Sequence, residues 1–172
     1  MERLGELAEE TGLHLHICIY GGSAMLLAYD SRDISRDVDV VIHPVEAGLE
    51  LARQVGDELG LHRDWLNDEV RFHISENDRD GRRSFELPFE SKGLKVEVPT
   101  ANYLLAMKAK ACREPVPGAE VDAADLRFLI RKMKIRSFDQ IRQQLDRFFP
   151  EYPLRPGAEA LIQRLIEEVC SE

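Results

Sequence analysis

The sequence predicts an α+β fold with a helical extension at its carboxyl end. Short runs of β-branched or alternating residues lie between helical segments as far as Pro99, whereas only helical spacing follows Thr100. The 172 residues are 44% hydrophobic, which is enough to bury a sizeable core. We therefore expect a mixed β-sheet flanked by helices over residues 1–99, and a helical region over residues 100–172 packed on that core.

The elements expected in the first third of the chain follow from residue spacing and from their terminators. Leucines and alanines at helical spacing predict a first helix that Gly12 ends. The alternating segment after it predicts a strand with Leu15, Ile17 and Ile19 on one side. The expected elements are a helix at 2–11, a strand at 13–20, a helix at 23–30, a strand at 37–44 and a helix at 45–61.

The middle of the chain carries weaker signals and one hairpin. We expect a helical turn at 65–70, a short strand at 71–75 and a polar loop at 76–83. Two strand-like runs follow, at 84–89 and 94–98, and a short polar segment joins them into a predicted hairpin.

Four helices are expected after Pro99. Thr100 and Ser137 stand where side chains cap helix N-termini, and proline-rich breaks separate the segments. The expected helices are 100–114, 120–135, 137–149 and 157–172.

Charge and cysteine content narrow the class of protein. The formal net charge of −9 disfavours non-specific attraction to nucleic acid or to an anionic membrane. Cys18, Cys112 and Cys170 are odd in number and far apart, so they indicate neither a disulfide framework nor a zinc cluster. The first residues lack the apolar core of a signal peptide and no run is long enough to span a bilayer. We expect a cytoplasmic protein with no membrane partner.

A Gly-Gly-Ser sequence lies where the first strand gives way to the second helix. Gly21, Gly22 and Ser23 would offer backbone N–H groups and a hydroxyl at a helix N-terminus, an arrangement suited to phosphate. No Gly-Lys-Ser/Thr follows, which excludes a P-loop, and the third glycine of a dinucleotide fingerprint is missing. A tight turn between strand and helix is the alternative explanation.

Two aspartates begin the next strand. Residues two apart on a strand share a face, so Asp37 and Asp39 would project together while Val38, Val40 and Ile42 pack on the other side. Adjacent carboxylates repel unless a cation neutralises them, and Mg²⁺ or Mn²⁺ shared with substrate phosphates meets that need. The alternative is an exposed strand face that simply carries two acids.

Together these two motifs resemble the opening of the nucleotidyltransferase superfamily with the DNA polymerase β-like fold. That family shows Gly-Ser or Gly-Gly-Ser at a helix start and Asp-x-Asp on the next strand. Thirteen residues separate Ser23 from Asp37 here, slightly more than is common in the family. Segments 64–72, 93–111 and 121–135 extend the likeness to a bacterial nucleotidyltransferase-like group related to the AbiEii toxins of toxin–antitoxin systems.

The resemblance implies roles for several later residues. Lys108, in Leu-Leu-Ala-Met-Lys, would place an ammonium against the triphosphate. Asp122 would lie opposite Lys108 across a helix pair, with Asp125 as a second acid. Many active transferases carry a third metal-binding carboxylate on a later strand, for which Glu97 is the candidate, with Glu86 a weaker alternative.

The resemblance therefore implies a metal-dependent enzyme that transfers a nucleoside monophosphate from a nucleoside triphosphate. The catalytic residues would be Asp37, Asp39, Lys108 and Asp122, and Glu97 would complete the metal site. The acceptor stays open among RNA such as tRNA, a protein and a small molecule. The alternative is an inactive protein of the same fold that acts as a binding partner, in a pair with an antitoxin-like protein.

Overall fold

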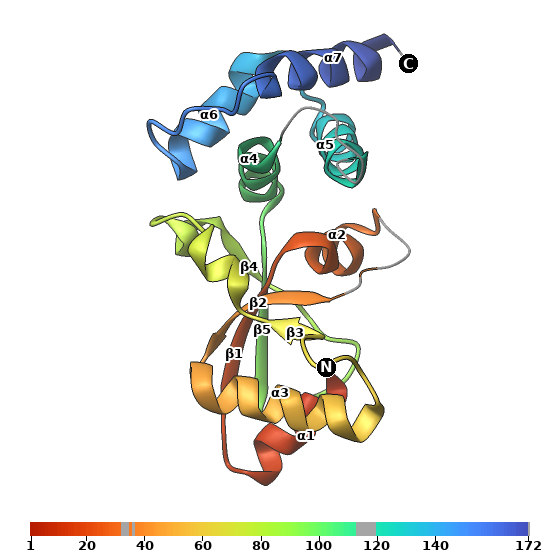
Figure 1. Cartoon of the computed structure of the whole chain (residues 1–172), viewed down its shortest axis with the longest axis vertical. Helices are drawn as coiled ribbons and strands as arrows, with labels where there is room; N and C mark the ends of the chain where they lie inside the picture. The colour runs from red at the N-terminus through yellow and green to blue at the C-terminus, as the bar shows by residue number, and fades with distance from the viewer. Residues whose placement is uncertain (32–34, 36, 113–119, 172) are drawn as a thin grey trace. The chain divides into compact units, whose positions relative to one another are not determined.

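The computed structural model describes residues 1–31, 35, 37–112 and 120–171, and it describes the backbone but not the side chains of residues 120–122. Over this part of the chain it contains seven α-helices and a five-stranded mixed sheet, which confirms the α+β class (Figure 1). The chain forms two compact units. One covers Met1–Ile74 and Arg82–Pro99, and the other covers Ser75–Gly81 and Thr100–Glu172.

The first unit holds the sheet and three helices. Gly12 (φ +70°) directly follows the end of the first helix, as the sequence predicts. The elements are α1 (Glu2–Glu10), β1 (Leu15–Ile19), α2 (Gly21–Tyr29), β2 (Val38–His43), α3 (Val45–Leu59), β3 (Leu66–Asn67), the 3-10 helix η1 (Glu69–Phe72), β4 (Arg82–Ser84) and β5 (Leu94–Pro99).

The strand order is β3-β2-β1-β5-β4. β1 pairs antiparallel with β2 and parallel with β5, and the outer pairs are parallel for β2 with β3 and antiparallel for β4 with β5. The central β1 therefore places residues of β2 and β5 on either side of it.

One face of the sheet forms the core of this unit. Leu15, Ile17 and Ile19 are at most 1% exposed, and the alternate residues of β2 and β5 beside them are buried too. α1 and α3 cover this face: a Cβ on Gly48 of α3 would meet the Ile42 side chain at 2.4 Å. The predicted alternation of β1 is confirmed.

Three expectations for the middle of the chain are wrong. The helical turn expected at 65–70 is instead the strand β3 at Leu66–Asn67, and helical structure begins only with η1 at Glu69. Residues 71–75 form no strand, because the Asn67 side chain accepts a hydrogen bond from the Glu69 N–H at 3.1 Å and the chain turns into η1 there. Phe72 is consequently 72% exposed. The hairpin exists, but its first strand is Arg82–Ser84, so that part of the expected polar loop is strand and the connection runs over residues 85–93.

The second unit is helical. Its elements are the 3-10 helix η2 (Asp78–Gly81), α4 (Ala101–Ala111), α5 (Glu120–Met133), α6 (Phe138–Phe148) and α7 (Ala158–Ser171). Thr100 caps α4 by accepting a hydrogen bond from the Tyr103 N–H at 3.4 Å, as the sequence predicts. At Ser137 the Gln140 side chain accepts from the Ser137 N–H at 3.2 Å. In the described part of the chain, no helix is long and apolar enough to cross a membrane.

Candidate functional site

The Gly-Gly-Ser motif forms the junction between β1 and α2. α2 begins at Gly21, whose φ of +58° lies in the left-handed region that favours glycine. A Cβ on Gly21 would lie 2.5 Å from Asp39 Oδ2. The carboxylate of Asp39 therefore lies directly against the first residue of α2, where the helix dipole favours negative charge.

Ser23 connects this junction to the start of β2. Its side chain is 4% exposed, and its hydroxyl donates a 2.6 Å hydrogen bond to the Asp37 carbonyl, which also accepts from the Ser35 hydroxyl at 3.0 Å. A serine hydroxyl has one proton to donate. Because that proton is engaged, donors for a phosphate at this turn are the backbone N–H groups, and Ser23 holds the two motifs together.

Asp37 and Asp39 lie on the neighbouring strand, as expected. Asp37 directly precedes β2, the Asp39 carbonyl accepts from the Tyr20 N–H at 2.8 Å, and both aspartates are half-buried. Val40 and Ile42 are buried on the opposite face, so the predicted alternation holds. The fold brings Asp39 against Gly21, and it joins Ser23 to Asp37 across the thirteen residues that separate them in the sequence.

Glu97 has three basic neighbours. Arg82 Nη1 and Lys95 Nζ lie 3.7 and 3.8 Å from its carboxylate, and His16 Nε2 lies at 3.1 Å but outside hydrogen-bond geometry. Within the described residues, no three histidine, cysteine or acidic side chains are grouped closely enough to hold a metal ion, so Asp37, Asp39 and Glu97 form no such set.

The strand registers explain why Glu97 and Asp39 stay apart. Glu97 pairs with Cys18, whereas continuing the β1–β2 pairing places Asp39 beside Tyr20. The two acids are thus separated by two strand spacings of about 5 Å each and by two residues, about 7 Å, along the strands. Glu97 does lie on the same face of the sheet as Asp39.

Arg82 is a further basic residue on this face of the sheet. The sequence pattern predicted a polar loop at its position. Its side chain is 13% exposed, and its guanidinium carbon lies 5.9 Å from the centre of the Tyr20 ring. The registers place Arg82, Pro99, Tyr20 and Asp39 in one row across the sheet. Arg82, Arg83 and Ser84 are all polar, so no alternation marks this strand in the sequence, and its position follows from pairing with β5.

Lys108 and Asp125 form a buried ion pair in the second unit. Lys108 Nζ lies 2.7 Å from Asp125 Oδ2, and the two side chains are 12% and 3% exposed. Asp125, the second of the two candidate acids, thus contacts Lys108. Asp122 lies in the first turn of α5, and its side chain is outside the described residues.

Comparisons with protein-family models, with curated proteins and with solved structures found no match. A functional assignment for this chain therefore depends on the geometry of its own residues and on the motif resemblance.

Proposed function

We propose that this chain is a metal-dependent nucleotidyltransferase that uses a nucleoside triphosphate. The observation that carries the proposal is the contact between Asp39 and Gly21, reinforced by the hydrogen bond from Ser23 to Asp37. These contacts join a helix N-terminus, which favours phosphate, to a pair of carboxylates, which favour a divalent cation.

The two carboxylates suit a magnesium ion better than a metal ion whose ligands all come from protein side chains. Mg²⁺ is commonly held by one or two carboxylates together with substrate phosphates and water. Asp37 and Asp39 are half-buried, so water and phosphate can reach them. When bound, the ion would neutralise charge on the transferring phosphoryl group and help to align it.

Other residues of the first unit would bind the triphosphate. The N–H groups of Gly21 and Gly22 would bind phosphate oxygens at the start of α2. Arg82, in the same row of the sheet as Asp39, would supply positive charge to the triphosphate. The roles that the resemblance gives to Lys108 and Asp122 stay predictions, as does the identity of the acceptor, for which RNA, a protein and a small molecule are all candidates.

The proposal is tested by calorimetric titration of each of the four ribonucleoside triphosphates, with and without Mg²⁺. We expect at least one triphosphate to bind, more tightly with Mg²⁺ than without it. Asp39→Asn should remove that Mg²⁺ dependence, whereas Asp57→Asn, at an exposed position of α3, should keep it. Failure of all four triphosphates to bind, or an unchanged Mg²⁺ effect in Asp39→Asn, would contradict the proposal.

A second candidate function is a non-catalytic binding partner, such as one component of a toxin–antitoxin pair. The ion pairs of Glu97 favour it, because they neutralise the carboxylate that a third metal ligand would need. Incubation with α-phosphate-labelled triphosphates and total RNA separates the two candidates. Label transfer to RNA or to protein supports the enzyme, and binding without transfer supports the partner.

A further inference from the structure

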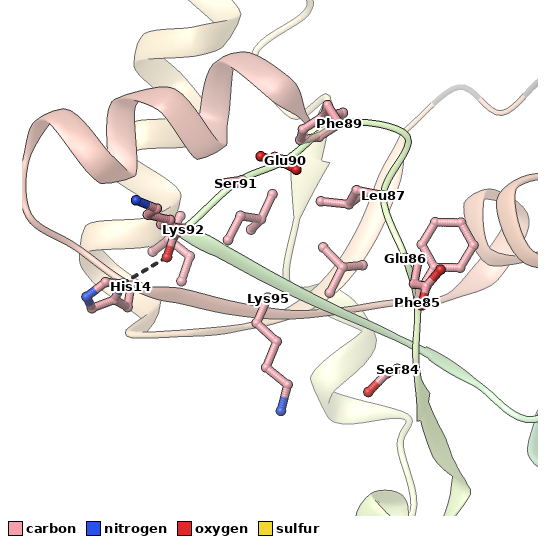
Figure 2. Close-up of a pocket in the computed structure, with 14 residues that line it drawn as sticks. His14, Ser84, Phe85, Glu86, Leu87, Phe89, Glu90, Ser91, Lys92 and Lys95 are labelled. Carbon is pink, nitrogen blue, oxygen red and sulfur yellow. Dashed lines mark hydrogen bonds between the residues drawn. The ribbon is translucent and has the colours of Figure 1, made fainter.

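A pocket of about 990 Å³ lies in the first unit, away from the Gly21–Asp39 junction. It is enclosed by the outer edge of β5 and by the segment 85–93 that connects β4 to β5 (Figure 2). The candidate nucleotide site uses none of its lining residues. The pocket therefore needs an explanation of its own.

β5 is longer than the strand that covers it. β4 has three residues and pairs with Glu97–Pro99 only, and after one more hydrogen bond, from the Phe85 N–H to the Val96 carbonyl at 3.0 Å, the chain leaves the sheet. The first residues of β5 thus present their outer edge to the pocket rather than to another strand.

Leu94 supplies the open hydrogen-bonding groups at this edge. The Leu15 N–H donates to the Gly93 carbonyl, so Gly93 and Lys95 direct their backbone groups toward β1, and Leu94 and Val96 direct theirs outward. Among the described residues, none forms a hydrogen bond with the outward N–H or carbonyl of Leu94. An unpaired donor and acceptor on a strand edge form a template for another strand.

Both apolar and charged side chains line the pocket beside this edge. Phe85, Leu87 and Phe89 alternate along the connecting segment, line the pocket and remain partly exposed. Figure 2 shows Lys92 beside His14 at the start of β5, and Glu86 beside Phe85 at the opposite end of the pocket. Glu90 and Lys95 also line the pocket, so charged side chains of both signs surround the apolar ones, with Lys92 at one end and Glu86 toward the other.

We propose that this pocket binds an extended segment of a partner protein, which adds to the sheet as a strand beside Leu94. Its backbone would exchange hydrogen bonds with Leu94, and an apolar side chain would lie among Phe85, Leu87 and Phe89. An acidic residue of the segment would face Lys92 and a basic residue would face Glu86. This interaction is independent of nucleotidyl transfer.

The first test uses linear peptides displayed on phage, selected against the full-length chain. We expect enrichment of peptides that carry an acidic residue, a central apolar residue and a basic residue in extended spacing. Phe89→Ala should lower the affinity of the chain for an enriched peptide by about tenfold, because the substitution removes apolar surface from the pocket. Phe72→Ala, which removes an exposed aromatic ring outside the pocket, is the matched control and should leave affinity unchanged.

The second test reads the backbone directly by amide hydrogen exchange with the enriched peptide bound. Exchange at the Leu94 N–H should slow, since a paired strand would take that donor, and Glu86→Lys should reverse the charge preference at that end of the peptide. Three outcomes would overturn the proposal: no enriched peptide, affinity insensitive to Phe89→Ala, or unchanged Leu94 exchange. A dimer of this chain that Phe89→Ala dissociates would overturn it too, by making a second copy the occupant.

Discussion

At the residue scale, Gly21 is the position where backbone conformation and the candidate site meet. Only glycine adopts its φ of +58° at little cost, and a side chain there would also meet the Asp39 carboxylate. The same residue therefore sets the start of α2 and leaves the space that Asp39 occupies.

Gly21→Ala should be more destabilising than Gly12→Ala. Both glycines have φ in the left-handed region, but a Cβ on Gly12 meets nothing within 4 Å. Gly12→Ala should thus cost about 1 kcal/mol of unfolding free energy, the conformational term alone. Gly21→Ala adds displacement of Asp39 and should also weaken triphosphate binding. Equal losses of unfolding free energy for the two variants in urea denaturation would show that displacing the Asp39 side chain costs no stability.

At the element scale, the helices were predictable and the short strands were not. Thr100 and Gly12 are local signals that act within one turn of the helix they limit. β4 has three residues and owes its position to pairing with β5, which is a non-local interaction that propensity does not encode. η1 likewise replaced an expected strand because one Asn67 hydrogen bond turns the chain.

The junction of α1 with the turn before β5 should respond to acid. The Glu9 carboxylate accepts hydrogen bonds from the Lys92 N–H at 2.6 Å and the Gly93 N–H at 3.2 Å, which lower its pKa below the ordinary 4.5. A lowered folded-state pKa gives stability that is present above the unfolded pKa and is lost as pH falls through the folded pKa. Urea titrations from pH 7 to pH 3 should therefore show a smaller acid loss in Glu9→Gln than in the parent chain. Glu167→Gln, on the exposed face of α7, is the control and should keep the parent's slope.

The contact between α4 and α5 depends on the Lys108–Asp125 pair. Breaking a buried pair removes a close opposite charge from the group that remains, so Asp125→Asn should cost about 3 kcal/mol of unfolding free energy. Lys108→Met combined with Asp125→Leu should recover much of that loss, because the desolvation cost disappears as well. Thermal unfolding of the single and double variants measures the difference.

The double variant also separates two roles for Lys108. If it is stable but transfers no nucleotide, the lysine acts in function as the resemblance implies. If stability and transfer both survive, the pair is structural. The sequence predicted a lysine–acid contact across this helix pair, and Asp125 makes one, whereas the Asp122 side chain lies outside the described residues.

At the scale of the whole molecule, the two units are interleaved in sequence. The chain passes between them after Ile74, after Gly81 and after Pro99, so residues 75–81 belong to the helical unit. Ser75 donates its N–H to the Tyr103 hydroxyl at 2.8 Å and its hydroxyl to the Phe148 carbonyl. The boundary at Pro99 can be predicted from the change from strand-like to helical spacing. The position of residues 75–81 cannot, because their hydrogen-bond partners lie far along the chain and the segment itself carries no local signal of where it packs.

A fragment of residues 100–172 should consequently be less stable than a fragment that also carries residues 75–81. Without them the buried Tyr103 hydroxyl and Phe148 carbonyl lose the hydrogen bonds that Ser75 donates, and each such loss costs about 1 kcal/mol or more. The Gly81 carbonyl accepts from the Thr100 N–H at 2.7 Å, so a short glycine linker can join the two segments. Thermal unfolding followed by circular dichroism should show a higher midpoint for the joined fragment, and Ser75→Ala within it should remove only the part that comes from the hydroxyl, because the backbone N–H still donates to Tyr103. Equal midpoints for both fragments would mean that the four helices form their core without this segment.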